Sequence, residues 1–146
     1  MKKEPFIIER VYNAPTETVW KAITNADEMR NWYFDIPDFK PQVGFDFQFS
    51  AGPPGKQYVH VCTITHVIPE KKISYSWSYK DYPGNSEVTF ELYPEGKKTR
   101  LKLTHEGLES FPSEFPDFSR ESFAAGWTEI IGKMLKNYLE KENVTA

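Results

Sequence analysis

The sequence predicts an α+β fold in which one curved antiparallel sheet of about six strands wraps round a single long C-terminal helix. Two observations lead to this prediction. The middle of the chain holds consecutive stretches in which apolar and polar residues alternate, joined by short turns, as in half-buried antiparallel strands. The C-terminal part then places apolar residues at steps of three and four, the pattern of an amphipathic helix. A sheet with one apolar face needs a cover, and only this helix is long enough to provide it.

The N-terminal part is expected to form a strand and two short helices. The strand occupies residues 6–12, which are β-prone, and it ends at Asn13-Ala14-Pro15. The proline suits the first turn of a helix that extends through Thr24. A second short helix runs from Asn25 to about Asn31, with Glu28 as the partner of Asn25 in a capping box.

Five strands should follow, separated by turns rich in proline and glycine. The clearest of them alternates large apolar residues with serines over residues 73–79. The predicted strands are Phe45–Phe49, Tyr58–Val67, Ile73–Tyr79, Val88–Leu92 and Leu101–Thr104. The predicted turns are Gly52-Pro53-Pro54-Gly55, the segment at Pro69, Asp81–Asn85 and Pro94-Glu95-Gly96-Lys97.

The longest helix is predicted over roughly Ser119 to Lys141, after a loop from Glu106 to Phe118. Ser119 suits the N-cap position, and Glu121 favours the positive end of the helix dipole. The apolar residues that recur along this helix are Phe123, Trp127, Ile130, Ile131, Met134, Leu135 and Tyr138.

Composition fits one globular domain over residues 1–146, with 39% apolar and 27% charged residues. The net charge of −3 argues against a nucleic-acid partner, because phosphate binding needs concentrated Lys and Arg. Cys62 is the only cysteine, which excludes an intramolecular disulfide and indicates a reducing compartment. The sequence shows neither a signal peptide nor an apolar run of membrane-spanning length, so we expect a cytoplasmic protein without membrane insertion.

Several motifs, in this order and spacing, resemble a known family over about residues 6 to 141. They are Val11-Tyr12-Asn13-Ala14-Pro15 with Val19-Trp20-Lys21-Ala22-Ile23-Thr24, then Trp32, then Pro69, Lys72, Ile73 and Trp77, and finally Gly126-Trp127 with Leu135 and Leu139. Together they look like the activator-of-heat-shock-protein-90-ATPase-homologue-like family of the START/birch-pollen-allergen (SRPBCC) superfamily. The resemblance implies a helix-grip fold, with a cavity between sheet and helix that binds lipids, polyketides, flavonoid-like or other apolar molecules in various relatives. It does not imply the chaperone activity of the name-giving protein.

The inner faces of the sheet and the long helix are rich in aromatic rings, drawn from 11 Phe, 8 Tyr and 4 Trp. One interpretation is a ring-lined pocket for a planar apolar guest; the other is a fully packed core. Gly126 and Gly132 within the helix would serve close packing or leave room for a guest. The predicted lining residues are Phe47, Phe49, Tyr75, Trp77, Phe90, Leu101, Leu103, Phe123, Trp127, Ile130 and Met134.

Two loops, 32–39 and 111–118, combine prolines with aromatic residues and are too apolar for ordinary solvent-exposed connections. We expect them to flank the cavity mouth as a gate or to form a dimer surface. The alternative is that they fold onto the domain and plug it. The residues at issue are Trp32, Phe34, Phe111, Phe115 and Phe118.

Metal binding and catalysis find little support in the sequence. His60, Cys62 and His66 share the parity of one strand, but no further ligand or metal motif accompanies them, so we expect no metal and no cofactor. No nucleophile motif or glycine-rich phosphate loop is present. Glu106 and Glu109 have the chemistry of acid–base groups, yet a solvated hinge explains them better.

Three hypotheses for function follow. The leading one is a carrier or sensor that binds a hydrophobic small molecule, aromatic or lipid-like, in an internal cavity. The second is a co-chaperone-like interaction module whose exposed aromatic loops contact a chaperone or a second copy of the chain. The third is an enzyme that acts on a polyketide-like substrate in the cavity, although nothing in the sequence demands catalysis.

Overall fold

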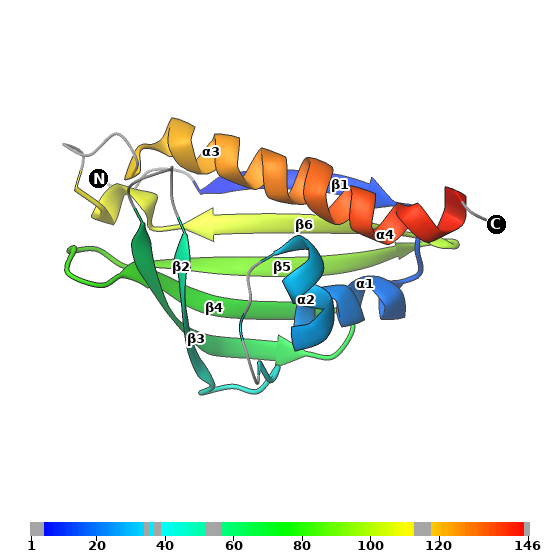
Figure 1. The fold of residues 1–146 in the computed structure, drawn as a ribbon, viewed down its shortest axis with the longest axis horizontal. Helices are drawn as coiled ribbons and strands as arrows, with labels where there is room; N and C mark the ends of the chain where they lie inside the picture. The colour runs from blue at the N-terminus through cyan, green and yellow to red at the C-terminus, as the bar shows by residue number, and fades with distance from the viewer. Residues whose placement is uncertain (1–4, 34–35, 37–38, 52–56, 113–117, 145–146) are drawn as a thin grey trace.

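Six antiparallel strands form one sheet in the computed structural model, which describes residues 5–33, 36, 39–51, 57–112 and 118–144, the side chains of 141–144 excepted. The strand order is β1-β6-β5-β4-β3-β2 (Figure 1). The strands are β1 (Phe6–Tyr12), β2 (Asp46–Ala51), β3 (Tyr58–Ile68), β4 (Lys72–Tyr79), β5 (Ser86–Glu95) and β6 (Lys98–Glu106). The predicted strands are therefore all present, and each of β2 to β6 pairs with its neighbour in the sequence.

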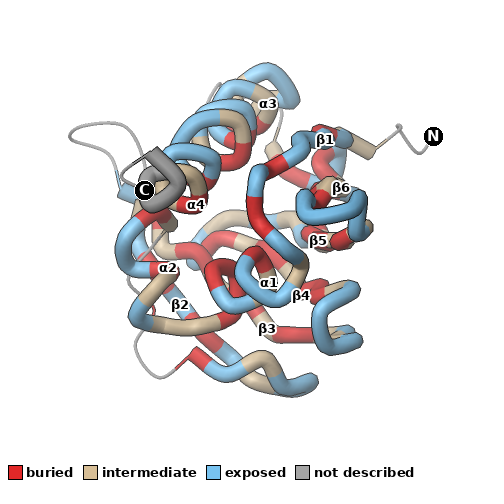
Figure 2. Tube along the Cα trace, turned by 90° about the vertical axis from the view of Figure 1, so that its right-hand side faces the viewer, coloured by how far each residue is buried: buried red, intermediate tan, exposed pale blue. Residues whose placement is uncertain are grey.

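The helices lie on one face of this sheet. They are α1 (Thr16–Thr24), α2 (Ala26–Trp32), the single turn η1 (Leu108–Ser110), and a long C-terminal helix made of α3 (Arg120–Glu129), η3 (Ile130–Met134) and α4 (Leu135–Val144). Figure 2 shows how the sheet curls from β1 round to β2, while the C-terminal helix lies across the open side with α1 and α2 beside it. The predicted α+β helix-grip architecture is confirmed. None of the described helices has the length and hydropathy needed to cross a bilayer.

The two short helices are joined by Asn25, which is both the end of α1 and the N-cap of α2. Its Oδ1 accepts a hydrogen bond from the backbone N–H of Glu28 at 3.1 Å, as predicted. The carboxylate of Glu28 does not complete the capping box, because it contacts Lys21 and Tyr138 instead. Through these two contacts Glu28 links α2 to both α1 and α4.

Two features of the sheet differ from the sequence prediction. Pro94 and Glu95 belong to β5, where they pair with Thr99 and Lys98, so the turn shrinks to Gly96-Lys97. Gly96 has a φ of 67°, the left-handed conformation that a two-residue hairpin turn requires.

The second difference is a bulge in β3 between Ile64 and His66. A bulge adds one residue to a strand and reverses the alternation beyond it. His60 and Cys62 therefore face inward, whereas His66 is exposed near Glu87 on the other face. The expectation that His60, Cys62 and His66 share one face is wrong for this reason.

The C-terminal helix begins as predicted, with the Ser119 Oγ accepting from the N–H of Ser122 at 3.1 Å. Its middle is a π-turn, in which the N–H of Leu135 bonds to the carbonyl of Ile130, five residues back. An α-helix rotates about 100° per residue, so each step of four residues drifts by about 40°. The wider π-turn cancels part of that drift. It keeps one buried face along the whole helix: Phe123, Trp127, Ile131, Leu135 and Leu139.

The prediction that Ile130 and Met134 face the sheet is corrected by this turn. Ile130 is only partly buried and Met134 is 39% exposed, while Ile131 and Leu135 are fully buried in their place. Neither glycine of this helix opens space for an interior guest, and neither serves close packing in the interior. Gly126 is exposed with open space at the position of a Cβ, and Gly132 faces the guanidinium of Arg10.

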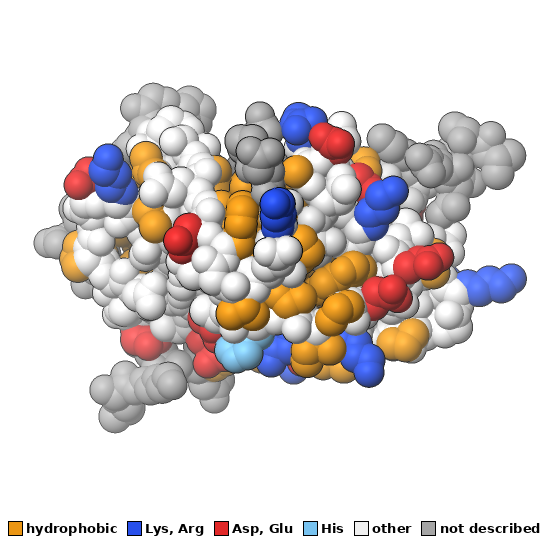
Figure 3. Space-filling view, turned by 90° about the horizontal axis from the view of Figure 1, so that it is seen from below, with side chains coloured by type: hydrophobic (Ala, Val, Ile, Leu, Met, Phe, Trp, Pro, Cys, Tyr) orange, Lys and Arg blue, Asp and Glu red, His pale blue; other side chains and the backbone are white. Residues whose placement is uncertain are grey.

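Hydrophobic side chains also gather in a band on the face shown in Figure 3, beside an exposed histidine. Val43 and Ile68 are the most exposed large hydrophobic residues of the described chain, at 66% and 50%. Both lie outside the space between sheet and helix.

Candidate ligand-binding site

The space between the concave face of the sheet and the C-terminal helix is filled with aromatic rings. Nine of the eleven predicted lining residues are buried there, which leaves Ile130 and Met134 as the exceptions. The buried nine are Phe47, Phe49, Tyr75, Trp77, Phe90, Leu101, Leu103, Phe123 and Trp127. Alternation along β2, β4, β5 and β6 places the sheet residues on one face, since the side-chain period of a strand is two.

Trp127 is the point where the helix meets this face. Its ring lies 5.4 Å from that of Trp77 and 6.1 Å from that of Phe90, measured between centroids. Its Nε1–H donates to Nδ1 of His105 at 3.0 Å. A buried tryptophan N–H needs such an acceptor, so this bond fixes both the ring and the helix that carries it.

His105 is fully buried on β6 and has a defined tautomer. Its Nδ1 must be the bare nitrogen, because an indole N–H can only donate. Nε2 therefore carries the proton and donates to Oγ of Ser86 at 2.7 Å, and that hydroxyl donates to the carbonyl of Trp77 at 2.8 Å. Burial lowers the pKa of His105 to about 3, so the imidazole is neutral at physiological pH.

Tyr33, the C-cap of α2, is partly buried and packs between the C-terminal helix and the sheet. Its ring stacks on Trp127 at 6.4 Å and meets Phe49 at 6.1 Å and Trp32 at 5.0 Å. Its hydroxyl lies 2.8 Å from the hydroxyl of Tyr75 on β4. Burial raises the pKa of both hydroxyls, so the pair is neutral. A side chain from the connection between α2 and β2 thus sits between helix and sheet.

The rings named as a gate pack inward where the structure describes them. Trp32 is buried and donates its Nε1–H to the carbonyl of Ala22 at 2.8 Å. Phe111 and Phe118 are buried against Tyr79, at 5.2 and 4.6 Å between centroids. Phe34 and Phe115 lie outside the described residues. The described rings thus match the alternative that these loops fold onto the domain.

Two further polar residues complete the inner face of β3. His60 stacks on Phe49 at 4.5 Å and packs against Tyr79 at 4.7 Å, and burial lowers its pKa to about 4. Cys62 is fully buried beside them, and burial raises the pKa of its thiol. No group of three metal-ligating side chains occurs within the described part of the chain.

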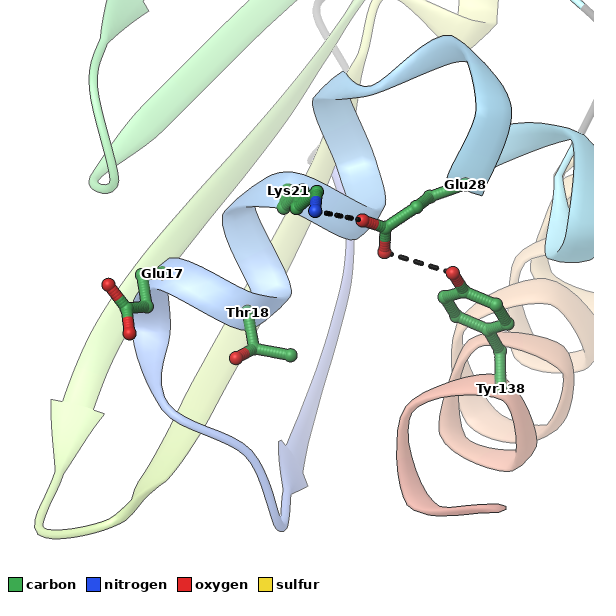
Figure 4. Close-up of a pocket in the computed structure, with 5 residues that line it drawn as sticks. All are labelled: Glu17, Thr18, Lys21, Glu28 and Tyr138. Carbon is green, nitrogen blue, oxygen red and sulfur yellow. Dashed lines mark hydrogen bonds and ion pairs between the residues drawn. The ribbon is translucent and has the colours of Figure 1, made fainter. Parts of the chain in front are cut away.

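A separate hollow of about 520 Å³ lies on the surface between α1, α2 and α4 (Figure 4). Its lining is polar, and Glu28 crosses it by pairing with Nζ of Lys21 at 3.5 Å and with Oη of Tyr138 at 2.9 Å. Glu17 and Thr18 complete its wall. A groove lined by charged and hydroxyl groups suits an apolar guest poorly, so it is not the predicted site.

Sequence reasoning missed Tyr33 and His105 as members of the interior. His105 could have been found, because it continues the parity of Leu101 and Leu103 along one strand. Tyr33 could not be found in this way, since the segment after α2 has no periodicity that orients a side chain. Its role depends on contacts with β2, β4 and α3.

The family model described as activator of Hsp90 ATPase homolog 1-like protein matches residues 13–140. The chain belongs to this family. The resemblance noted from the sequence motifs is therefore confirmed, and so is the SRPBCC-type fold. A comparison with curated proteins gives no match.

Solved structures with the same fold cover nearly the whole chain. Protein MLL2253 from Mesorhizobium loti is 31% identical, with a TM-score of 0.74 over 94% of this chain and 97% of that one. Protein CV1439 from Chromobacterium violaceum is 21% identical, with a TM-score of 0.77 over 94% and 97%. DynU16, a protein in the dynemicin biosynthetic locus, is 19% identical, with a TM-score of 0.75 over 96% of this chain and 48% of that one.

Proposed function

We propose that this chain binds a hydrophobic, planar small molecule between the concave face of its sheet and the α3–η3–α4 helix, as a carrier or sensor. The observation that carries the proposal is the position of Tyr33 between Trp127 and the sheet. Tyr33 is the C-cap of α2, and its backbone N–H bonds to the carbonyl of Met29 at 2.7 Å. Rotation of this one side chain opens ring-sized space without breaking the sheet or the long helix.

The chemistry of the interior favours binding over catalysis. Burial lowers the pKa of His60 and His105 and raises that of Tyr33 and Tyr75, so these groups are uncharged at neutral pH. A general acid or base works best with a pKa near the working pH. Neutral hydrogen-bonding groups among apolar walls instead orient a guest. The similarity in fold to DynU16, a protein in a biosynthetic locus, is compatible with small-molecule binding by this chain.

The interaction-module hypothesis loses part of its basis. It relied on exposed aromatic loops, and Trp32, Phe111 and Phe118 are buried. The family name alone does not supply a contact surface, since one fold carries many functions. Interior binding therefore remains the better-supported function.

A thermal-shift screen of the full chain with flavonoids, fatty acids and sterols tests the proposal. A ligand at about 100 times its Kd stabilises the native state by about 2.7 kcal/mol. For a chain of this length that raises Tm by roughly 5 to 10 °C. The same ligand should quench tryptophan fluorescence by stacking near Trp127 and Trp77.

Two matched variants locate the site. Trp127→Phe should reduce the ligand-dependent quenching and leave the part from Trp77, whereas Trp20→Phe, on α1, should retain all of it. A ligand that stabilises both variants and the parent chain equally, with identical quenching, would occupy another place such as the groove of Figure 4. That result would overturn the interior site.

A further inference from the structure

We infer that the interior site selects a phenol, and that the side chain of Tyr33 is its built-in occupant, which the guest displaces. The inference rests on the proposed function and adds the chemical class of the guest. Tyr33 carries a planar ring with a hydroxyl at its far end, and the structure shows what receives each part.

The ring of Tyr33 packs against three aromatic rings, each from a different element. Trp127 of α3 is nearly parallel to it, at 21°, while Phe49 of β2 is tilted at 53° and Trp32 of α2 stacks at 28°. Offset stacking on such rings depends on a flat aromatic face, not on the identity of the molecule that supplies it. A free aromatic ring therefore fits the same place.

The hydroxyl of Tyr33 forms a hydrogen bond with the hydroxyl of Tyr75, and the surroundings of Tyr75 are otherwise apolar. Rings of Phe47 and Phe90 pack against Tyr75 at 5.1 and 5.9 Å, and Trp77 follows at 6.5 Å. Within the described residues, the Tyr33 hydroxyl is the side-chain partner of the Tyr75 hydroxyl. If Tyr33 left without a replacement, a buried hydroxyl would lose its partner, which is unfavourable. A guest with a hydroxyl group avoids that loss.

The two indole N–H groups near this place already have partners within the protein. The Trp77 Nε1–H donates to the Tyr79 hydroxyl at 2.9 Å, and the Trp127 Nε1–H donates to His105. The Tyr33–Tyr75 pair is therefore the one a guest takes over. The buried residues of the described chain include no Lys or Arg, so a carboxylate guest would lack a charged partner. A phenol meets both conditions, because its hydroxyl bonds to Tyr75 and it carries no charge.

The test uses the side-chain analogues p-cresol and toluene as probes, with affinity measured by calorimetry on the full chain. Tyr33→Ala should bind p-cresol roughly tenfold more tightly than toluene, the ratio that one ordinary hydrogen bond gives. In the double variant Tyr33→Ala/Tyr75→Phe the preference should fall to about one. Far-UV circular dichroism confirms that each variant is folded.

Tyr33→Phe provides a milder arm that keeps the occupant's ring and removes only its hydroxyl. It should bind p-cresol more tightly than the parent chain does, because p-cresol restores the hydrogen bond to Tyr75 and the phenylalanine cannot. Equal affinities of the parent chain and Tyr33→Phe for p-cresol would overturn displacement.

The failures of the two proposals are distinguishable. If folded Tyr33→Ala binds p-cresol and toluene equally, the phenol preference is overturned while interior binding stands. If folded Tyr33→Ala binds neither probe, interior binding and the phenol preference are both overturned.

Discussion

His60 and His105 show how the surroundings of single residues set their chemistry. Both are buried among rings, and the pKa falls to about 4 for His60 and about 3 for His105 because burial penalises the charged imidazolium. The tautomer of His105 is fixed by its two partners, Trp127 and Ser86. His105 links the sheet to the C-terminal helix through Trp127, whereas His60 packs among rings of the sheet.

The free energy of unfolding should therefore fall as the pH drops from about 6.5 to about 4. In this window the unfolded chain binds protons at both histidines and the native chain does not, so acid favours the unfolded state. Each histidine contributes a slope of up to about 1.4 kcal/mol per pH unit. Urea unfolding at several pH values measures it. His105→Gln should lower the slope. An equal slope in the parent chain and His105→Gln would contradict the assignment.

At the scale of elements, the π-turn η3 sets which residues of the long helix meet the sheet. A sequence with apolar residues at both Ile130 and Ile131, and at both Met134 and Leu135, is compatible with two helix faces. The turn selects Ile131 and Leu135, and the carbonyl of Ile131 accepts the hydroxyl of Tyr12 from β1. The turn thus also supplies the acceptor for a buried tyrosine.

Truncations at neighbouring positions test this face. Ile131→Ala should destabilise the protein by about 2 to 5 kcal/mol, the usual loss for a buried large aliphatic side chain. Met134→Ala, at a 39% exposed position, should cost less than about 1 kcal/mol. Urea unfolding compares them. Equal losses of stability, or a larger loss for Met134→Ala, would contradict the assignment of Ile131 to the buried face of the helix.

The elements themselves were predictable from sequence where local rules decide them. Alternation with serine defined β4, and capping residues defined the starts of α2 and α3. The bulge in β3 was not predictable, because the run Tyr58–Val67 is apolar on both parities and cannot show where its alternation reverses. The π-turn was not predictable either, because apolar residues at both Ile130 and Ile131, and at both Met134 and Leu135, fit two helix faces equally well. Tyr33 depends on long-range contacts, which no local pattern contains.

For the molecule as a whole, Cys62 reports whether the two layers open. It is the only cysteine, and it is fully buried on the inner face of β3. A reagent can reach it only when the interior is exposed. Its reactivity therefore measures opening of the site.

Iodoacetamide should modify Cys62 slowly in the native protein and at least about tenfold faster in Tyr33→Ala, because removal of the ring favours opening. A bound guest should slow the reaction again. Mass spectrometry follows the modification, and the urea-unfolded chain gives the uninhibited rate. Identical native rates for the parent chain and Tyr33→Ala would argue that Tyr33 does not control access.

The pairing of β1 with β6 has a consequence for synthesis of the chain. Phe6 to Tyr12 lie opposite His105 to Thr99, and Tyr12 reaches a carbonyl 119 residues further on. On the ribosome, which adds about 5 to 20 residues per second, the first strand must wait several seconds for its neighbour to emerge. Contacts this distant in sequence form slowly. During that delay β1 has no partner strand, so this is the stage at which the nascent chain is most prone to aggregation.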